Sequence, residues 1–440
     1  MLTAWWCEQA WLPAGMARQV LITVDGERIT AVTADSPPGE ARRLAGLTLP
    51  GLANAHSHAF HRALRGRTQR GRGTFWTWRE QMYAVAARLD PSSYLALARA
   101  TYAEMALAGI TCVGEFHYLH HQPGGTPYDE PNVMGAALIQ AATEAGIRMT
   151  LLDTCYLAGG FGRPLAGPQL RFGDGTADGW AERVSALSTS DGARLGAALH
   201  SVRAVPVEQL APVVDWAADR TAVLHVHLSE QVSENEQCQA AHGMTPTELL
   251  AESGGLGPRS IAVHGTHLTD GDIALLGSSG TGICLCPTTE RDLADGIGPA
   301  RRLASAGCPV SLGSDSHAVV DLLEEARAVE LDERLSTQER GHFDVTELLG
   351  MATVNGHAAL GWPDAGRLAV GALADFTTVR LDSPRTAGAG EYAAETVVFA
   401  ATGADVTDVV VGGRHVVHEG RHMMVPDVGP ALDKAIGAVT

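Results

Sequence analysis

The sequence predicts an α/β protein that combines a (β/α)8 TIM-type barrel with a small β-sandwich-like domain built from both chain ends. Eight short apolar runs end in polar or histidine-containing segments, and helix-like stretches separate most of them. Both flanks read instead as β-branched, glycine-punctuated strands and hairpins. A chain of 440 residues with 45% hydrophobic residues is long enough for both parts. We expect the barrel at 51–362 and the small domain at 1–50 and 363–440.

The eight predicted barrel strands alternate with helices, which indicates a parallel sheet with both faces covered. Helical stretches such as 94–109, 132–146 and 269–280 have glycine near the end, where helices commonly stop. The strand segments are LTLPGLANAHSHA, ITCVGEFHYLHH, RMTLLDTCY, RLGAALHSVRAV, AVLHVHLSEQ, SIAVHGTHL, GICLCPTTE and PVSLGSDSHA. Polar residues gather at their C-terminal ends, where barrel enzymes place their chemistry.

The flanking strands lie in 1–12 and 18–35 before the barrel, and in 366–381 and 404–423 after it. An open doubly wound sheet is the structural alternative to the barrel. It is disfavoured because no glycine-rich dinucleotide fingerprint follows the first strand.

Charge and composition exclude several classes of function. A net charge of -18, from 32 basic and 50 acidic residues, argues against nucleic acid or an anionic membrane as partner and favours a small molecule. Lys434 is the only lysine in the sequence. A P-loop, a Schiff-base site and a carboxylated-lysine binuclear metal site each need a lysine within the catalytic domain, so none is expected.

The seven cysteines are scattered and contain no C-x-x-C pair, which indicates neither a disulfide framework nor a zinc ribbon. The first residues lack a basic segment ahead of an apolar run, and no stretch approaches the ~20 apolar residues of a membrane span. We therefore expect a cytoplasmic protein.

The strongest chemical signal is His56-Ser57-His58 at the end of the first barrel strand. Side chains on a strand alternate with period two, so both imidazoles face the same side, which in a barrel can be the interior. An isolated H-x-H is a weak motif, since paired histidines also occur in loops and surface strands.

Three further strand ends supply matching side chains. They contain His225, His227 and Glu230 on strand five, His264 and His267 on strand six, and Asp315 with His317 on strand eight. Histidines and carboxylates at four strand ends suit Zn²⁺ or another borderline divalent ion with an open position for water. The alternative is that these are unrelated polar residues that cap loops. It is disfavoured because each buried imidazole would then need its own hydrogen-bond partner.

The motifs PGLANAHSHAFHRA, HVHLSE, AVHGTHL, GSDS and GRLAVGALADF resemble the amidohydrolase superfamily over nearly the whole chain. This resemblance implies one divalent metal ion, for which Zn²⁺ is the first choice. The implied ligands are His56, His58, His227 and Asp315. The resemblance also implies that Glu230 and His264 are catalytic. The H-x-x-E spacing selects His227 over His225, which shares its predicted face.

The same residue types suit hydrolysis of a C–N bond without the resemblance. A divalent ion lowers the pKa of water, and the Asp315 carboxylate can accept a proton as hydroxide attacks an sp² carbon. Glu230 can then protonate the departing nitrogen, while His264 orients the hydroxide and stabilises developing charge.

Two arginines on the active-site side indicate the substrate class. Arg79 lies in the segment 73–80, expected to be an aromatic, glycine-led loop after strand one, and Arg203 follows strand four. An arginine in such a position can bind a carboxylate through two parallel hydrogen bonds. The alternative is that each arginine forms a structural salt bridge.

Four segments are similar to the formimidoylglutamate deiminase family of bacterial histidine degradation: FWTWRE, HSHAFHRAL, EFHYLHH and HSVRAV. That resemblance implies hydrolysis of N-formimidoyl-L-glutamate, a linear dicarboxylate, to N-formyl-L-glutamate and ammonia. The implied substrate contacts are His61, Arg79, Tyr118, His200 and Arg203. His61 departs from the glutamine that the resemblance places after HSHAF.

Two other functions stay open at this point. A deaminase of a purine, pterin or other cyclic amidine would share every metal-site residue, and a metal-free non-catalytic relative would have lost ligands, none of which is missing here. His267 and His317 are expected in loops. The run 117–121, with His117, His120 and His121, is expected to line a pocket as a substrate contact at most. A homodimer is expected because such barrels commonly form one.

Overall fold

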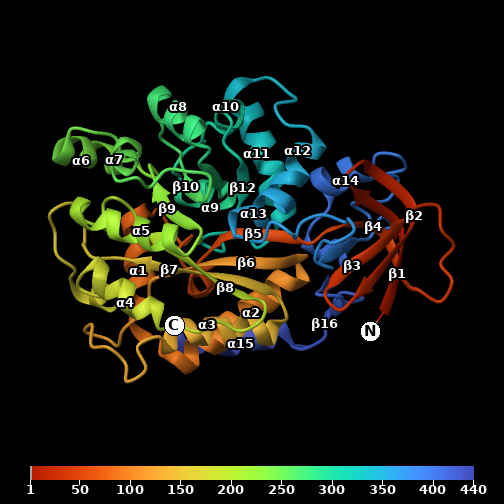
Figure 1. Ribbon diagram of the computed structural model, residues 1–440, viewed down its shortest axis with the longest axis horizontal. Helices are drawn as coiled ribbons and strands as arrows, with labels where there is room; N and C mark the ends of the chain where they lie inside the picture. The colour runs from red at the N-terminus through yellow and green to blue at the C-terminus, as the bar shows by residue number, and fades with distance from the viewer. Residues whose placement is uncertain (1) are drawn as a thin grey trace.

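The computed structural model describes residues 2–440 and contains two eight-stranded sheets (Figure 1). One sheet has the order β12-β11-β10-β9-β8-β7-β6-β5, and every neighbouring pair in it is parallel. Its strands are β5 (Leu52–Ser57), β6 (Ile110–His117), β7 (Arg148–Cys155), β8 (Ala193–Leu199), β9 (Leu224–Leu228), β10 (Ser260–His264), β11 (Gly282–Leu285) and β12 (Val310–Leu312). Each corresponds to one of the eight predicted segments, so the predicted strand count is confirmed.

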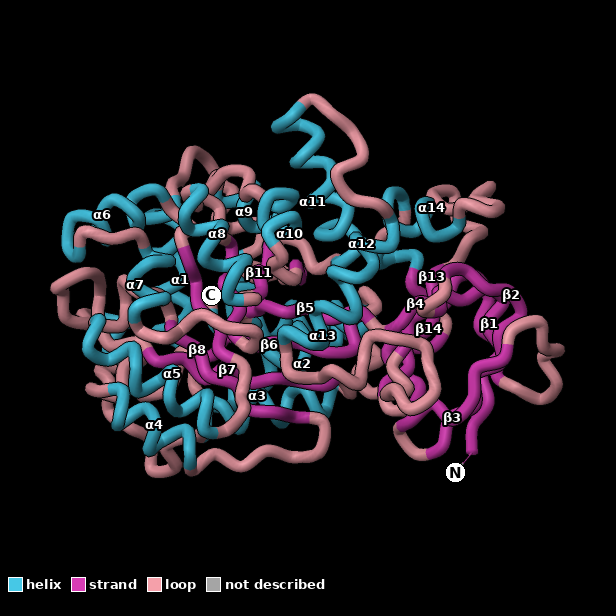
Figure 2. Tube along the Cα trace, turned by 45° about the horizontal axis from the view of Figure 1, so that its top comes forward, coloured by secondary structure: helices cyan, strands magenta, loops and turns pink. Residues whose placement is uncertain are grey.

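A parallel bridge between Ser57 and Asp315 joins the two edges of this sheet and closes it into a barrel. Helices surround the strands, as the tube view shows (Figure 2). Those between the first strand and the last are α1 (Phe75–Arg88), α2 (Pro91–Leu107), α3 (Val133–Ala145), α4 (Ala177–Ser185), α5 (Leu210–Asp219), α6 (Val232–His242), α7 (Pro246–Glu252), α8 (Asp270–Ser279), α9 (Pro287–Leu293) and α10 (Ala300–Ala306). After β12 come α11 (Leu322–Thr337), α12 (Val345–Gly350) and α13 (Gly356–Ala359). The fold class is therefore the predicted barrel.

The second sheet draws its strands from both ends of the chain, in the order β16-β15-β14-β13-β4-β1-β2-β3. Its strands are β1 (Leu2–Leu12), β2 (Gly15–Asp25), β3 (Arg28–Thr33), β4 (Arg42–Pro50), β13 (Phe376–Val379), β14 (Val406–Val411), β15 (Arg414–His418) and β16 (Arg421–His422). An apolar cluster that includes Trp5, Ile22, Phe376 and Val410 forms its own core. This sheet is the predicted small β domain.

The first predicted strand segment, 47–59, belongs to both sheets. It divides at Gly51, so that β4 pairs with β1 and β13 whereas β5 pairs with β6. A Cβ at Gly51 would lie 2.2 Å from Thr111 Oγ1. Only glycine therefore fits at the point where the chain passes from one sheet to the other. The small sheet is thereby joined directly to the strand that carries His56.

Two helices near the C-terminus pack on helices of the barrel. Helix α14 (Ala393–Ala400) contacts α11 and α12. Helix α15 (Val428–Val439) contacts α2, and Val428 and Leu432 share an apolar cluster with Ala100 and Ala103. Burial of this apolar stripe explains why the last helix returns to the barrel.

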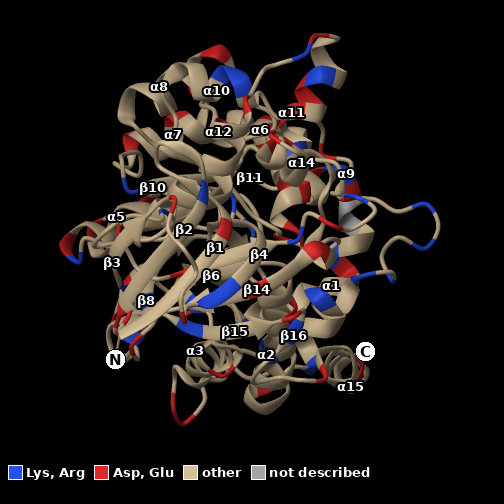
Figure 3. Cartoon of the chain, turned by 90° about the vertical axis from the view of Figure 1, so that its right-hand side faces the viewer, with Lys and Arg blue, Asp and Glu red and all other residues tan. Residues whose placement is uncertain are grey.

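Within residues 2–440 no helix is long and apolar enough to cross a membrane. On the side of the molecule that carries the small sheet, acidic and basic residues are interspersed over strands, helices and loops (Figure 3).

Candidate active site

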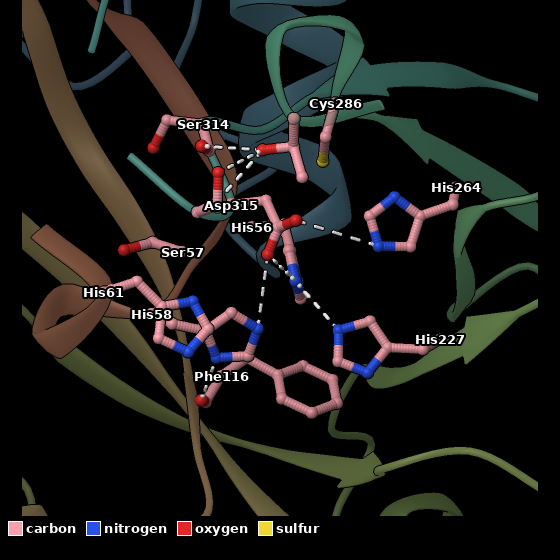
Figure 4. Close-up of polar contacts among 12 residues, drawn as sticks. His56, Ser57, His58, His61, Phe116, His227, His264, Cys286, Ser314 and Asp315 are labelled. Atoms are coloured by element: carbon pink, nitrogen blue, oxygen red, sulfur yellow. Dashed lines mark hydrogen bonds and ion pairs between the residues drawn. The ribbon is translucent and has the colours of Figure 1, made fainter. Parts of the chain in front are cut away.

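The strands that close the barrel bring the first metal-ligand candidates together. His56 and His58 lie at the end of β5, and Asp315 follows β12. The Nε2 atoms of His56 and His58 lie 3.3 and 3.4 Å from Asp315 Oδ1. All three residues are buried, and their side chains point toward one another (Figure 4).

Two further histidines complete the cluster from neighbouring strands. His227 Nε2 on β9 lies 3.1 Å from His56 Nε2, and His264 Nε2 on β10 lies 3.9 Å from Asp315 Oδ2. One ligand atom from each of His56, His227, His264 and Asp315 lies within 4.8 Å of all the others. His58 reaches the same carboxylate in a second such group with His61. Figure 4 shows these rings converging on Asp315.

Hydrogen bonds set the tautomer of two of these imidazoles. His58 Nδ1 lies 2.9 Å from Phe116 O, and His227 Nδ1 lies 2.9 Å from His200 O. A carbonyl oxygen only accepts, so each Nδ1 carries the proton and each Nε2 presents a lone pair to the cluster. Burial also lowers the pKa of His58 and His227 well below the usual value, which favours the neutral, metal-binding form. The donor set therefore fits a borderline divalent ion.

The pKa values of the two carboxylates of the site are shifted in opposite directions. Burial opposes ionisation of Asp315, but the hydrogen bond and charge of His56 hold its pKa well below the usual range. For Glu230, burial raises the pKa above the usual value. Glu230 Oε1 lies 4.0 Å from His264 Nε2, and the charge of Glu230 contributes to raising the pKa of His264 against the effect of burial. The pKa values of the two carboxylates are therefore pushed apart, which is the pattern expected where a base and an acid share one site.

A pocket opens above this cluster, and every substrate contact implied by the resemblance lines it. The lining side chains are His58, His61, Trp78, Arg79, Met82, Tyr83, Tyr118, Tyr156, Phe172, His200, Arg203, His227, Glu230, His264, Leu293 and Asp315. Arg203 Nε is buried and has no hydrogen-bond partner among the described residues. His61 Nε2 lies 3.1 Å from Tyr118 Oη. The pocket therefore combines two carboxylates, Glu230 and Asp315, with the cationic donors of Arg79 and Arg203.

Arg79 does not lie in a loop, as the sequence suggested for 73–80, but in the first turns of α1. Thr74 caps this helix, because its side chain accepts from the Thr77 N–H while the Thr77 hydroxyl bonds the Thr74 backbone. Aromatic composition and a leading glycine concealed this capping box. The helix aims Arg79 into the pocket more rigidly than a loop would.

Sequence reasoning missed a tyrosine pair that holds Arg79. Arg79 Nε donates to Tyr83 Oη at 2.5 Å, and Arg79 Nη2 donates to Tyr156 Oη at 3.4 Å. Gln169 Nε2 also donates to Tyr156 Oη, at 3.1 Å, and the Tyr156 ring lies 4.2 Å from that of His200. Tyr156 follows β7, so its position at a strand end was the available signal.

The histidine run after strand two does not line the pocket, contrary to the prediction. His117, His120 and His121 are buried in a separate polar network. His120 Nε2 lies 2.9 Å from Thr154 O, and His121 Nε2 lies 3.0 Å from Asp174 Oδ1. Arg183, Asp153 and Asp174 complete this network. The local sequence does not reveal these partners, because they lie on other elements.

The other histidines near these strand ends also lie outside the cluster. His225 Nε2 lies 2.9 Å from Ala359 O, near the opposite end of β9 from Glu230. His267 and His317 lie in loops as expected, and His317 Nε2 contacts Ser57 Oγ at 3.0 Å.

Fold and site together define a barrel protein with a candidate metal centre at the C-terminal ends of its strands. Residues 47–416 match the Amidohydrolase family, and the chain belongs to this family. The resemblance seen in the motifs is thereby confirmed.

Three similar proteins sharpen this assignment. Formimidoylglutamate deiminase of Pseudomonas aeruginosa is 38% identical, with 96% of each chain covered. 8-Oxoguanine deaminase of the same species is 32% identical, covering 85% of this chain and 83% of that one. The crystal structure of an amidohydrolase from Brucella melitensis superposes with a TM-score of 0.90 at 34% identity and covers 99% of both chains.

Proposed function

We propose that the protein hydrolyses N-formimidoyl-L-glutamate to N-formyl-L-glutamate and ammonia. The unpartnered, buried Arg203 Nε beside the acid–base cluster is the observation that carries the proposal. A buried guanidinium donor without a partner is costly, and a substrate carboxylate would satisfy it. The 38% identical formimidoylglutamate deiminase supports the same substrate.

The reaction adds one water across the C=N bond and then breaks the C–N bond. Asp315, whose pKa is held low, takes a proton from the attacking water, and a C–O bond forms at the amidine carbon. Glu230, whose pKa burial raises, delivers a proton to the departing nitrogen. The proton held by Asp315 passes to the same nitrogen, and the hydroxyl proton of the adduct returns to Glu230. The C–N bond then breaks, ammonia leaves, and the formyl C=O remains on the glutamate nitrogen. His264 hydrogen-bonds and stabilises charge at the reacting centre.

We propose zinc as the ion and His56, His58, His227 and Asp315 as its ligands. A divalent ion held there supplies Lewis-acid chemistry and makes water a nucleophile near neutral pH. The Nε2–Oδ1 separations of 3.3 and 3.4 Å support this set, since tetrahedral ligands at about 2.0–2.1 Å lie about 3.3 Å apart.

The two carboxylates of the substrate would bind on two sides of the pocket. Arg203 supplies one cationic donor, and Arg79, held by Tyr83 and Tyr156, supplies the other. A cytoplasmic homodimer remains the expectation from sequence.

The deciding experiment measures ammonia release by zinc-reconstituted protein from N-formimidoyl-L-glutamate, with guanine, adenosine and cytosine in parallel and a chelated control. We expect chelator-sensitive release from the linear compound alone. Arg203→Ala should raise KM for it, whereas Arg340→Ala, at an exposed position far along the chain, should not. No ammonia from the linear compound would overturn the proposal.

A cyclic amidine is the second candidate substrate. The pocket walls include Trp78, Tyr118, Tyr156 and Phe172, on which a planar ring can stack, and the 32% identical relative is an 8-oxoguanine deaminase. Release from guanine but not from the linear compound would select this alternative and leave the arginines without a carboxylate to bind.

A further inference from the structure

A second group of metal-ligand side chains lies in the small β domain, away from the candidate active site. We propose that Asp408, His415 and His418 bind a second divalent ion of the borderline class, such as Zn²⁺. One ligand atom from each of these side chains lies within 4.8 Å of the other two. Two imidazoles and one carboxylate form a donor set that zinc and its neighbours in the first transition row accept.

A β-bulge brings the three side chains onto one face. In the antiparallel pair of β14 and β15, Val409 pairs with Val417 but Val410 pairs with His415, so β15 has one extra residue, Val416. Histidines three residues apart on a regular strand would face opposite sides. The extra residue reverses the alternation, and bulges commonly re-aim a side chain in this way. The two strands are labelled side by side in Figure 3.

Cross-strand register supplies the carboxylate. Because Val409 pairs with Val417, Asp408 lies opposite His418. His418 Nδ1 lies 2.8 Å from Asp408 Oδ1, and His415 Nε2 lies 3.3 Å from the same oxygen. The two rings are 4.7 Å apart between centroids. Both histidines therefore present a nitrogen to one point beside a single carboxylate oxygen.

These separations fit an ion without a large rearrangement. Ligands at about 2.0–2.1 Å from a tetrahedral zinc lie about 3.3 Å from one another. The His415–Asp408 separation already has this value, and His418, whose side chain is 48% exposed, has room to move by the remaining ~0.5 Å. The candidate catalytic ligands show the same spacing, with 3.3 and 3.4 Å to Asp315.

His415 has an unsatisfied nitrogen that points to a ligand. Its Nε2 is buried and, despite the 3.3 Å approach to Asp408, makes no hydrogen bond with any described residue. The ring packs edge-on against Trp5, with centroids 4.6 Å apart, which holds it in this orientation. A bound ion would satisfy that nitrogen.

The open side of the cluster leaves room for water to complete the coordination. Asp408 and His418 line a surface cavity of about 520 Å³. Its wall also carries three acidic and two basic side chains, Glu8, Asp382, Glu419, Arg43 and Arg380, so it has a net negative charge before Asp408 is counted. A three-ligand site with an open position is a common arrangement for zinc.

The third histidine cluster of the described chain shows the contrast. His117 and His120 also lie near a carboxylate, Asp153, but both oxygens of Asp153 accept from Arg183. A guanidinium in that position repels a cation, so we assign no ion there.

Isothermal titration of Zn²⁺ into protein whose active site is already loaded tests the proposal. We expect one additional ion per chain, bound in the micromolar range or tighter. His418→Ala should remove that binding step or weaken it by roughly tenfold or more. His342→Ala, at a half-buried position outside this cluster, should leave it intact.

Asp408→Asn supplies an independent variant, since it keeps the size of the side chain but removes the charge. Both variants should melt within a few degrees of the parent protein in the absence of added ion. An unchanged second binding step in His418→Ala and Asp408→Asn, or no second step in the parent protein, would overturn the proposal. Deimination of any substrate plays no part in this readout.

Discussion

The backbone N–H of Asp315 donates a 3.0 Å hydrogen bond to the carbonyl oxygen of His56, and its carboxylate lies 3.3 Å from His56 Nε2. The same strand contact that closes the barrel therefore assembles the metal-ligand cluster. Closure and chemistry depend on one another, because a barrel that failed to close at β5 and β12 would separate the base from the histidines.

Asp315→Asn should abolish most activity with little loss of fold. The amide keeps the size and the backbone contact of Asp315 but cannot accept a proton, so kcat should fall by roughly 10²–10⁴-fold. Metal content should fall as well, because a charged ligand is lost. Steady-state kinetics and metal analysis measure both effects, with the exposed Asp382→Asn as control. Retention of full activity would remove Asp315 from the mechanism.

Glu230 should produce the alkaline limb of the pH–rate profile. Burial first, and then the charges of Asp315 and Glu290, raise its pKa against the effect of His264. A raised pKa keeps the proton on Glu230 where an ordinary glutamate has lost it, so activity should fall as pH rises through that raised value.

Glu230→Gln should lower kcat by roughly 10²–10⁴-fold and remove this limb from the residual rate. Glu236→Gln, at an exposed position of the nearby helix α6, should leave both the rate and this limb unchanged. An identical alkaline limb in Glu230→Gln would assign the titration to another group.

The sequence contained the information for the barrel because each strand is a local pattern. An apolar run that ends in HSH, HLSE or GSDS marks both a buried strand and its C-terminal edge. The C-terminal ends of all barrel strands meet at one rim. The sequence alone therefore predicts that His56 and Asp315 lie close together, although they are far apart in the chain.

Other features depend on contacts that no local pattern records. The division of 47–59 at Gly51 follows from the approach of Thr111, a residue of the next strand. Tyr156 contacts Arg79 of α1, which is 77 residues away in the sequence, and Gln169, which lies beyond the end of its strand. The histidines after strand two lie near Arg183 because α4, which carries this arginine, packs against them. The segment predicted to line a pocket is therefore buried in the interior.

Tyr156→Phe should weaken substrate binding through Arg79. The hydroxyl accepts from Arg79 Nη2 and from Gln169 Nε2, so its loss releases one restraint on the guanidinium. A hydrogen bond to a charged group is worth about 1.5–3 kcal/mol, and the 3.4 Å length places this one at the low end.

We expect kcat/KM to fall by roughly tenfold, mainly through KM. The exposed Tyr392→Phe should have no effect. A fall in kcat at unchanged KM would indicate that Tyr156 acts at the reacting centre instead.

His61→Gln should be tolerated far better than His61→Ala. Burial lowers the pKa of His61 to about 3, so the imidazole is neutral at physiological pH. Glutamine also presents a neutral donor, and it can reach Tyr118 Oη, which His61 Nε2 contacts at 3.1 Å.

We expect kcat/KM of His61→Gln to stay within roughly threefold of the parent and that of His61→Ala to fall by roughly tenfold. Kinetics with the linear substrate and with guanine measure whether selectivity changes too. Equal losses in both variants would show that the imidazole shape, rather than a neutral donor, matters at this position.

Asp153 should control stability rather than activity. It is fully buried and accepts from Trp180 Nε1 at 2.9 Å and from both Arg183 Nη atoms at 2.8 and 3.0 Å. Burial opposes its ionisation, but the charge of Arg183 dominates with that of His120 and lowers the pKa to about 2. Asp153→Asn leaves Arg183 with one carboxylate fewer and should cost about 3–5 kcal/mol in the free energy of unfolding.

The pH dependence of that loss follows from the sign of the shift. A pKa lowered on folding stabilises the native state above the unfolded value of about 3.9, and this stabilisation disappears as pH falls toward about 2. Urea unfolding of the zinc-loaded protein at pH 7 should therefore separate parent and variant, and the gap should narrow as acid is added. Asp191→Asn, at an exposed position, should match the parent throughout. A constant gap down to pH 3 would mean that Asp153 stabilises through its shape and not through its charge.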